Sequence, residues 1–163
     1  RTKTEAFIIR SAQEHTSYKT DNSHIDLYLG DGIKVMAEIP DKSIDFIFTD
    51  PPYGHNNNNG DLISMREKVL GKGTAGPPRP ILNDGPEADV LCKSMLKEAR
   101  RILKPGSCLC CCCAGGAGPN LQYANWALWM ADEIGLKQVV VWAKGPIGMG
   151  WHYRKSYEFV LVG

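Results

Sequence analysis

The sequence has almost no net charge and no long apolar run. Its 163 residues include 19 Lys and Arg against 18 Asp and Glu, a formal charge of +1 at pH 7. Any binding to nucleic acid would therefore depend on a local basic surface. No segment approaches the roughly 18 to 20 consecutive apolar residues of a membrane span, and the first 20 residues lack the apolar core of a signal peptide. We expect a cytoplasmic protein without a membrane partner.

The sequence also lacks a convincing fingerprint for phosphate or dinucleotide binding. The phosphate-cradling pattern G-x-x-x-x-G-K-[ST] is absent, which leaves an ATPase or GTPase without support. A G-x-G-x-x-G match occurs at residues 71–76, but prolines follow it and no predicted strand precedes it. That fingerprint requires a strand, a tight turn and a helix amino terminus, so we reject the match. The glycine-rich turn at 115–118 fails as well, because Leu121 stands where the third glycine belongs.

Four of the six cysteines are consecutive, which raises the question of a metal or redox site. Adjacent residues on a strand point to opposite faces, so the run cannot bring four sulfurs to one ion. Free cysteine is among the most buried residue types, and a central strand needs small apolar side chains on both faces. We therefore predict a buried strand and no metal ligands. The cysteines are Cys92, Cys108, Cys110, Cys111, Cys112 and Cys113.

Predicted strands and helices alternate along the chain. This order predicts an α/β fold with a mostly parallel sheet and helices on both faces. We assign residues 1–24 to an amino-terminal extension and 25–163 to one unit with a loop insertion at about 55–82, either a solvated connector or a functional lid. The predicted strands are 25–29, 44–49, 107–113, 139–142 and 157–162, and the predicted helices are 33–39, 85–103 and, capped by Asn120, 120–134.

The most informative stretch is Asp50-Pro51-Pro52-Tyr53, at the carboxyl end of the predicted strand 44–49. Open α/β sheets place ligands at this position. The prolines fix φ and remove two N–H donors, so the turn is rigid and offers carbonyl oxygens. A carboxylate beside such a carbonyl can accept both hydrogens of an exocyclic amino group, while the tyrosine ring can stack on a flat base. The alternative is an ordinary strand-end turn, for which Asp and Pro are common.

An amino group attached to an aromatic base is a poor nucleophile, because its lone pair is delocalised into the ring. Holding both hydrogens out of the ring plane would direct the lone pair toward an electrophile. A sulfonium methyl donor fits that requirement. Methyl transfer to an amino nitrogen is thus a reaction that the turn at Asp50 fits.

Asp50-Pro51-Pro52-Tyr53 resembles the catalytic motif of amino-group DNA methyltransferases, which make N6-methyladenine or N4-methylcytosine. Further motifs resemble successive landmarks of the permuted β-type members and extend the resemblance over residues 25–163. The resemblance implies a Rossmann-like methyltransferase fold, which in this chain is incomplete. These motifs are Leu29-Gly30-Asp31, residues 40–45, Leu103-Lys104-Pro105-Gly106, and Trp142-Ala143-Lys144-Gly145 followed by Tyr157-Glu158.

The resemblance implies roles for individual residues. Asp50 and the carbonyl of Pro51 would bind the target amino group within the rigid turn that includes Pro52. Tyr53 would stack on the base after it leaves the duplex. Asp31 resembles an acidic residue assigned to the adenosine of S-adenosylmethionine, and Asp50 lies beside the same cofactor. The implied partner is double-stranded DNA. The resemblance leaves open whether the protein is a monomer or a homodimer.

Several polar and aromatic residues are candidates for contact with DNA. Rings mixed with positive charge suit both backbone contacts and an extruded base. His55 and Asn56 could bind the flipped nucleotide or the DNA strand that loses its pairing partner, although asparagines also simply form turns. A solvated loop with one or two packed rings is the alternative for the later group. The candidates are His55, Asn56, Lys144, Trp151, Tyr153, Arg154 and Lys155.

One part of the family pattern is missing. β-type members bind the methyl donor with a later F-x-G-x-G-like element that follows their target-recognition region, and neither occurs before Gly163. By family sheet order, the missing segment supplies strands between 25–29 and 44–49. We expect a fragment that alone binds S-adenosylmethionine poorly and methylates little.

The leading hypothesis is a DNA adenine-N6 methyltransferase of a prokaryotic or phage restriction-modification system. The alternatives are an N4-cytosine DNA methyltransferase, an RNA or protein amino-methyltransferase, and a catalytically incomplete DNA-binding remnant.

Overall fold

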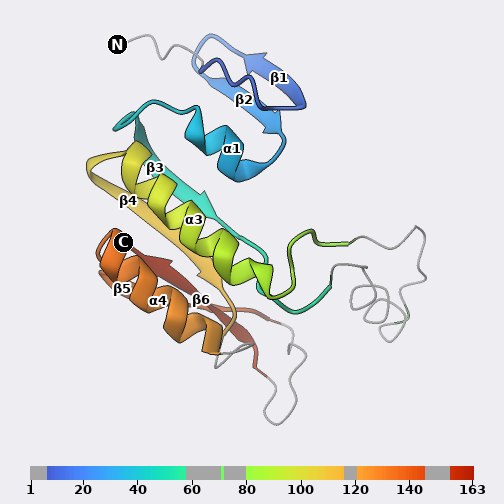
Figure 1. Ribbon diagram of the computed structural model, residues 1–163, viewed down its shortest axis with the longest axis vertical. Helices are drawn as coiled ribbons and strands as arrows, with labels where there is room; N and C mark the ends of the chain where they lie inside the picture. Colours follow the sequence, from blue (N-terminus) through green and yellow to red (C-terminus); the bar gives the residue numbers. More distant parts are fainter. Residues whose placement is uncertain (1–6, 58–70, 72–79, 116–120, 146–154) are drawn as a thin grey trace.

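The computed structural model describes residues 7–57, 71, 80–115, 121–145 and 155–163 (Figure 1). A four-stranded sheet with two helices on it forms the main body, and a separate two-stranded ribbon lies beside it (Figure 1). No helix among the described residues is long and apolar enough to cross a membrane. The elements are β1 (Glu14–Lys19), β2 (His24–Leu29), α1 (Gly32–Ala37), β3 (Ile44–Thr49), α3 (Glu87–Ile102), β4 (Leu103–Cys113), α4 (Gln122–Glu133), β5 (Gln138–Ala143) and β6 (Tyr157–Val162).

The main sheet has the strand order β3-β4-β6-β5. Only β3 and β4 pair in parallel, whereas β6 runs antiparallel to both β4 and β5. The prediction of a mostly parallel sheet was therefore wrong for the described residues. The reason is visible in the sequence: no helical pattern separates residues 139–142 from 157–162. Because parallel neighbours need a long crossover, usually a helix, β6 turns back and inserts between β5 and β4.

The strand predicted at 25–29 belongs to the ribbon rather than to the main sheet. β2 pairs antiparallel with β1 over six residue pairs, from Glu14 opposite Leu29 to Lys19 opposite His24. The structure thus adds a strand within the segment assigned to an amino-terminal extension. Among the described residues, β2 has no pairing with β3. This separation agrees with the expectation that the sheet is interrupted between these two strands.

Both α3 and α4 cover the same face of the main sheet (Figure 1). Side chains from the two helices and from β4 and β6 form the core, whose largest fully buried members include Trp126, Leu96, Leu109, Met130 and Leu161. In β4 the cysteines alternate, so Cys111 and Cys113 join this core, as a buried strand requires. The predicted central cysteine strand is confirmed, and in the structure it begins earlier, at Leu103.

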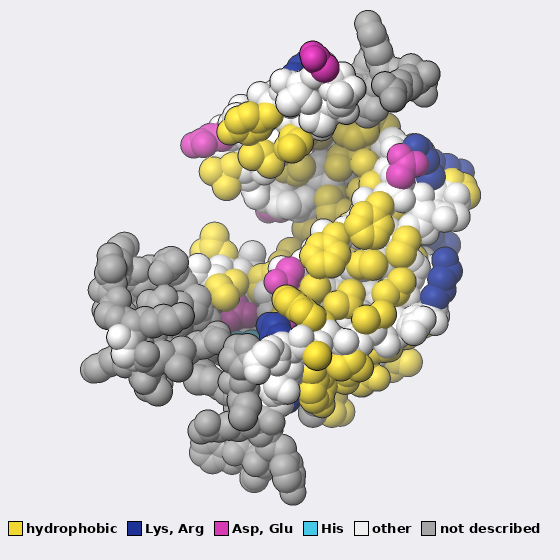
Figure 2. Space-filling model, turned by 180° about the vertical axis from the view of Figure 1, so that it is seen from behind, with side chains coloured by type: hydrophobic (Ala, Val, Ile, Leu, Met, Phe, Trp, Pro, Cys, Tyr) yellow, Lys and Arg dark blue, Asp and Glu magenta, His cyan; other side chains and the backbone are white. Residues whose placement is uncertain are grey.

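The opposite face of the main sheet is not covered by any described helix, which corrects the prediction of helices on both faces. Phe46 and Phe48 of β3 point to that side and are 55% and 63% exposed. Figure 2 shows hydrophobic side chains gathered on this side of the molecule. On β2 the alternate residues Ile25, Leu27 and Leu29 are also more than half exposed. The described residues therefore leave apolar surface open on both β2 and β3.

Candidate functional site

The turn at residues 50–53, here called the Asp50 turn, follows β3 at the carboxyl edge of the parallel β3–β4 pair. The hydroxyl of Tyr53 donates to Asp50 Oδ1 at 2.6 Å. Among the described residues, no backbone N–H donates to the carbonyl oxygens of Pro51 or Pro52. A carboxylate has about four lone-pair positions, so Asp50 retains acceptor capacity after binding Tyr53. The turn presents a carboxylate and backbone carbonyls as acceptors on a rigid frame.

Tyr53 connects this turn to the core. Its ring meets Trp126 edge-on at 6.4 Å between centroids, and His55 lies in a similar edge arrangement at 5.9 Å. Burial raises the pKa of Tyr53 far above its usual value, and the Asp50 carboxylate reinforces the shift. The phenol therefore stays protonated and acts as a hydrogen-bond donor to Asp50 across the physiological range.

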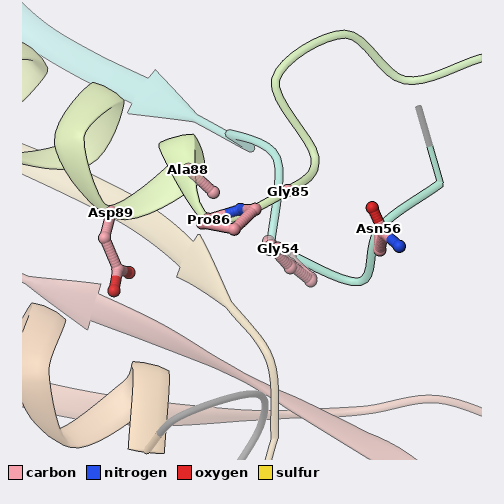
Figure 3. Close-up of a pocket in the computed structure, with 7 residues that line it drawn as sticks. Gly54, Asn56, Gly85, Pro86, Ala88 and Asp89 are labelled. Atoms are coloured by element: carbon pink, nitrogen blue, oxygen red, sulfur yellow. The ribbon is translucent and has the colours of Figure 1, made fainter.

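A pocket of about 330 Å³ opens next to Tyr53 (Figure 3). This volume lies at the lower end of the range for small-molecule sites. One side comes from the loop after the Asp50 turn and the other from the start of α3, with Asn56 and Asp89 at opposite ends of the labelled residues (Figure 3). Besides Tyr53, the lining residues are Gly54, Asn56, Gly85, Pro86, Ala88 and Asp89.

Asp84, which the sequence analysis did not single out, holds the loop after Tyr53. Its Oδ1 accepts the backbone N–H of Gly54 at 2.9 Å and of His55 at 3.2 Å, and its Oδ2 accepts the N–H of Asn57 at 3.0 Å. The residue is only 2% exposed. The buried Asp84 carboxylate thus takes the place of water as the hydrogen-bond acceptor for the amides of Gly54, His55 and Asn57.

Two side chains on α4 approach the turn from the other side. Gln122, 2% exposed, donates through Nε2 to the carbonyl of Tyr53 and accepts the N–H of Ala114 through Oε1 at 3.1 Å. Trp126 donates through Nε1 to Asp89 Oδ1 at 2.8 Å. These bonds join the carboxyl end of β4, the start of α3 and the Asp50 turn.

Charged groups lie near this site just after β5, within β6 and two residues before β6. Lys144 pairs with Glu158 and places Nζ 4.7 Å from the centroid of Trp142. Burial lowers the pKa of Lys155, and Glu158 opposes that shift. Desolvation by surrounding protein also lowers the pKa of His55, with Asp84 acting in the opposite sense. At neutral pH His55 is therefore a neutral hydrogen-bonding ring.

The remaining predicted site residues divide into two groups. Asp31 caps α1, accepting the N–H groups of Ile33 and Lys34 at 3.0 and 3.3 Å. No contact among the described residues joins Asp31 to the Asp50 turn. Trp151, Tyr153 and Arg154 lie outside the described residues, as do the predicted cap Asn120 and most of the insertion. The structure thus brings together Asp50, Tyr53 and His55, with Lys144 and Lys155 nearby.

Known proteins match this chain over part of its length and theirs. The type II methyltransferase M.HinfI of Haemophilus influenzae is 38% identical over 81 residues, which cover 46% of this chain and 20% of that protein. PvuII DNA methyltransferase, a cytosine-N4-specific enzyme, aligns with a TM-score of 0.53 and 14% identity, covering 83% of this chain and 47% of its own. No family model matches the sequence.

The chain resembles DNA modification methyltransferases. TTHA0409, a proposed DNA modification methylase of Thermus thermophilus, also aligns, with a TM-score of 0.50, 18% identity and coverage of 82% of this chain and 49% of its own. The resemblance inferred from the Asp50 turn and its accompanying motifs is confirmed. The two structures support an α/β methyltransferase-like fold, of which the described residues form a part. This methyltransferase-like chain spans about half the length of those structures.

Proposed function

We propose that the protein is a DNA methyltransferase that transfers a methyl group from S-adenosylmethionine to the N6 amino group of adenine. The observation that carries this proposal is the Asp50 turn. Its carboxylate is oriented by the Tyr53 hydroxyl at 2.6 Å, beside prolyl carbonyls without a backbone donor among the described residues. Both hydrogens of one amino group can then be bound, by Asp50 and by the carbonyl of Pro51, with Pro52 keeping the turn rigid.

In this proposal the pocket next to Tyr53 receives the flipped base. Tyr53 contributes ring surface on one side, while its hydroxyl keeps the Asp50 carboxylate pointed at the amino nitrogen. With S-adenosylmethionine bound, Asp50 and the Pro51 carbonyl would hold the amino group with its lone pair toward the methyl carbon, and the proton released on methylation would pass by way of the Asp50 carboxylate to water. His55 and Asn56, on the rim of the site, bind the displaced nucleotide. Lys144, Lys155, Trp151, Tyr153 and Arg154 are proposed to contact the DNA backbone or the extruded base.

S-adenosylmethionine supplies the methyl group on a sulfonium that becomes a neutral thioether when it leaves. Asp31 is exposed just after the carboxyl end of β2. Among the described residues, the hydrogen bonds that its side chain accepts, from Ile33 and Lys34, both go to Oδ1. Its other oxygen can accept a hydroxyl of the adenosine portion, which fits the role proposed for it. Asp50 would lie at the methyl end.

The open surfaces of β2 and β3 bear on how active these 163 residues are alone. Asp31 and Asp50 follow strands that belong to different sheets. Nothing in the described residues fixes these two carboxylates relative to each other by strand pairing. We therefore propose that efficient donor binding and transfer need a further polypeptide segment, in the same protein or another chain.

The test is methyl transfer from labelled S-adenosylmethionine to DNA by the full-length protein. Asp50→Ala should abolish turnover and leave much of the DNA affinity, because most of the DNA contacts proposed here are made by other residues. Asp132→Ala, at an exposed position on α4, is the matched control and should behave as wild type. A wild-type protein that binds DNA without any turnover would instead favour a non-catalytic remnant. Turnover on RNA or protein but not on DNA would indicate one of the other substrate classes.

A further inference from the structure

We infer that Asp84 is a positioning residue that fixes the loop after the Asp50 turn through its buried carboxylate. This inference rests on the proposed function for its catalytic consequence, but its structural content stands on the contacts of Asp84. We call Asp84 and the three amides it binds, those of Gly54, His55 and Asn57, the Asp84 clamp.

The loop that the clamp holds has an unusual backbone. Gly54 has φ of +74° and Asn56 has φ of +61°, both in the left-handed region. Consecutive amides in such turns point toward one concave side and favour an anion there. In this chain the anion is the Asp84 carboxylate, which lies 27 to 30 residues further along the sequence than the amides it accepts.

Backbone bonds extend the clamp on both sides. The amide of Asn56 donates to the carbonyl of Asp84, and the amide of Ile81 donates to the carbonyl of Asn57 at 3.1 Å. Gly54 also packs closely on the start of α3, since an added Cβ would lie 3.3 Å from the carbonyl oxygen of Gly85. The loop is thereby fastened to the segment that begins α3.

The clamp has a direct consequence for the Asp50 turn. β3 holds the turn at its amino end, and Gln122 holds the carbonyl of Tyr53. The clamp adds a third restraint by fixing the very next amide, that of Gly54. With both ends restrained, Tyr53 keeps the ring position from which its hydroxyl reaches Asp50 at 2.6 Å. Small displacements of a catalytic group cost large factors in rate, so loss of the clamp should lower turnover.

Two substitutions give a graded test. Asp84→Asn can keep one oxygen for the pair Gly54 and His55, but its amide nitrogen then faces the N–H of Asn57. Asp84→Ala removes both carboxylate oxygens and so takes this acceptor away from all three amides. Hydrogen exchange of the three amides should therefore rise mainly at Asn57 in the first variant and at all three in the second. The expected increase is about ten- to a hundredfold, as for losing a hydrogen bond to a charged group.

The functional readout uses the full-length protein. We expect kcat per folded molecule to fall in the order wild type, Asp84→Asn, Asp84→Ala, with the dissociation constant for DNA within about threefold of wild type. Asp132→Asn, an exposed aspartate on α4, is the matched control and should leave exchange and kcat unchanged. A residue that only stabilises the fold would lower the melting temperature without lowering kcat of the folded fraction, and that result would overturn the inference.

The wild type alone also tests the clamp. The amides of Gly54, His55 and Asn57 should be protected to a degree similar to amides of β4, and free exchange of these amides would overturn the inference even if both variants failed to fold. Absence of methyl transfer by the wild type would count against the proposed function only, because the exchange pattern does not depend on catalysis.

Discussion

Replacing Tyr53 by Phe removes one hydroxyl and keeps the ring that packs against Trp126. The hydroxyl donates to Asp50 Oδ1 at 2.6 Å, and hydrogen bonds to charged groups contribute roughly 1.5 to 3 kcal/mol. Because Asp50 is exposed to solvent, we reduce this to about 1 kcal/mol. If the bond orients the carboxylate for catalysis, that energy corresponds to a fall of about fivefold in kcat.

Single-turnover methyl transfer by the full-length protein measures this effect without interference from product release. Wild type and Tyr53→Phe should differ by that factor at saturating DNA and S-adenosylmethionine, with similar affinity for both. Burial holds the pKa of Tyr53 well above its usual range, so the hydroxyl does not titrate during catalysis. The basic limb of the pH profile should therefore be the same in both proteins. An unchanged single-turnover rate constant would refute the role given to this hydrogen bond.

Three further predictions concern the core around the site. Burial raises the pKa of Cys113 from about 9 to about 12. The contribution of this thiol to the free energy of unfolding is therefore complete below pH 9 and is lost as the pH rises toward 12. In urea unfolding, Cys113→Ala should lose less stability than wild type over that alkaline range. Gly115→Ala should destabilise the fold by about 1 to 3 kcal/mol in the same assay, because the new Cβ would lie 2.4 Å from the carbonyl oxygen of Tyr157. In native protein a thiol reagent should modify Cys108 and Cys110, which are half-buried, before the other cysteines, and equal reactivity of all six would contradict the buried strand.

Local patterns in the sequence were sufficient to place most elements. The apolar runs at 44–49 and 157–162 coincide with β3 and β6, and the helical period between residues 85 and 103 contains α3. These elements follow from side-chain periodicity within one segment, which sequence reasoning can read. The antiparallel course of β6 depends on pairing between distant segments, and the missing helix before it was its only local sign.

The site was predictable to a similar extent. The Asp50 turn could be found because its four residues are contiguous and its chemistry follows from their types. Asp84 and Gln122 could not be found this way, because their partners between Tyr53 and Asn57 lie 27 to 69 residues away and each resembles an ordinary turn or helix residue in sequence. β1 was also missed, since its six residues are exposed and carry no apolar alternation.

The central claim is that the Asp50 turn presents an exocyclic amino group for methylation. The most direct measurement is digestion to nucleosides of DNA that the full-length protein has modified with labelled S-adenosylmethionine. We predict label in N6-methyladenine, and label in N4-methylcytosine would keep the amino-group claim while correcting the base. Label on carbon 5 of cytosine would contradict the claim, because that carbon carries no amino hydrogens for Asp50 and the Pro51 carbonyl to bind.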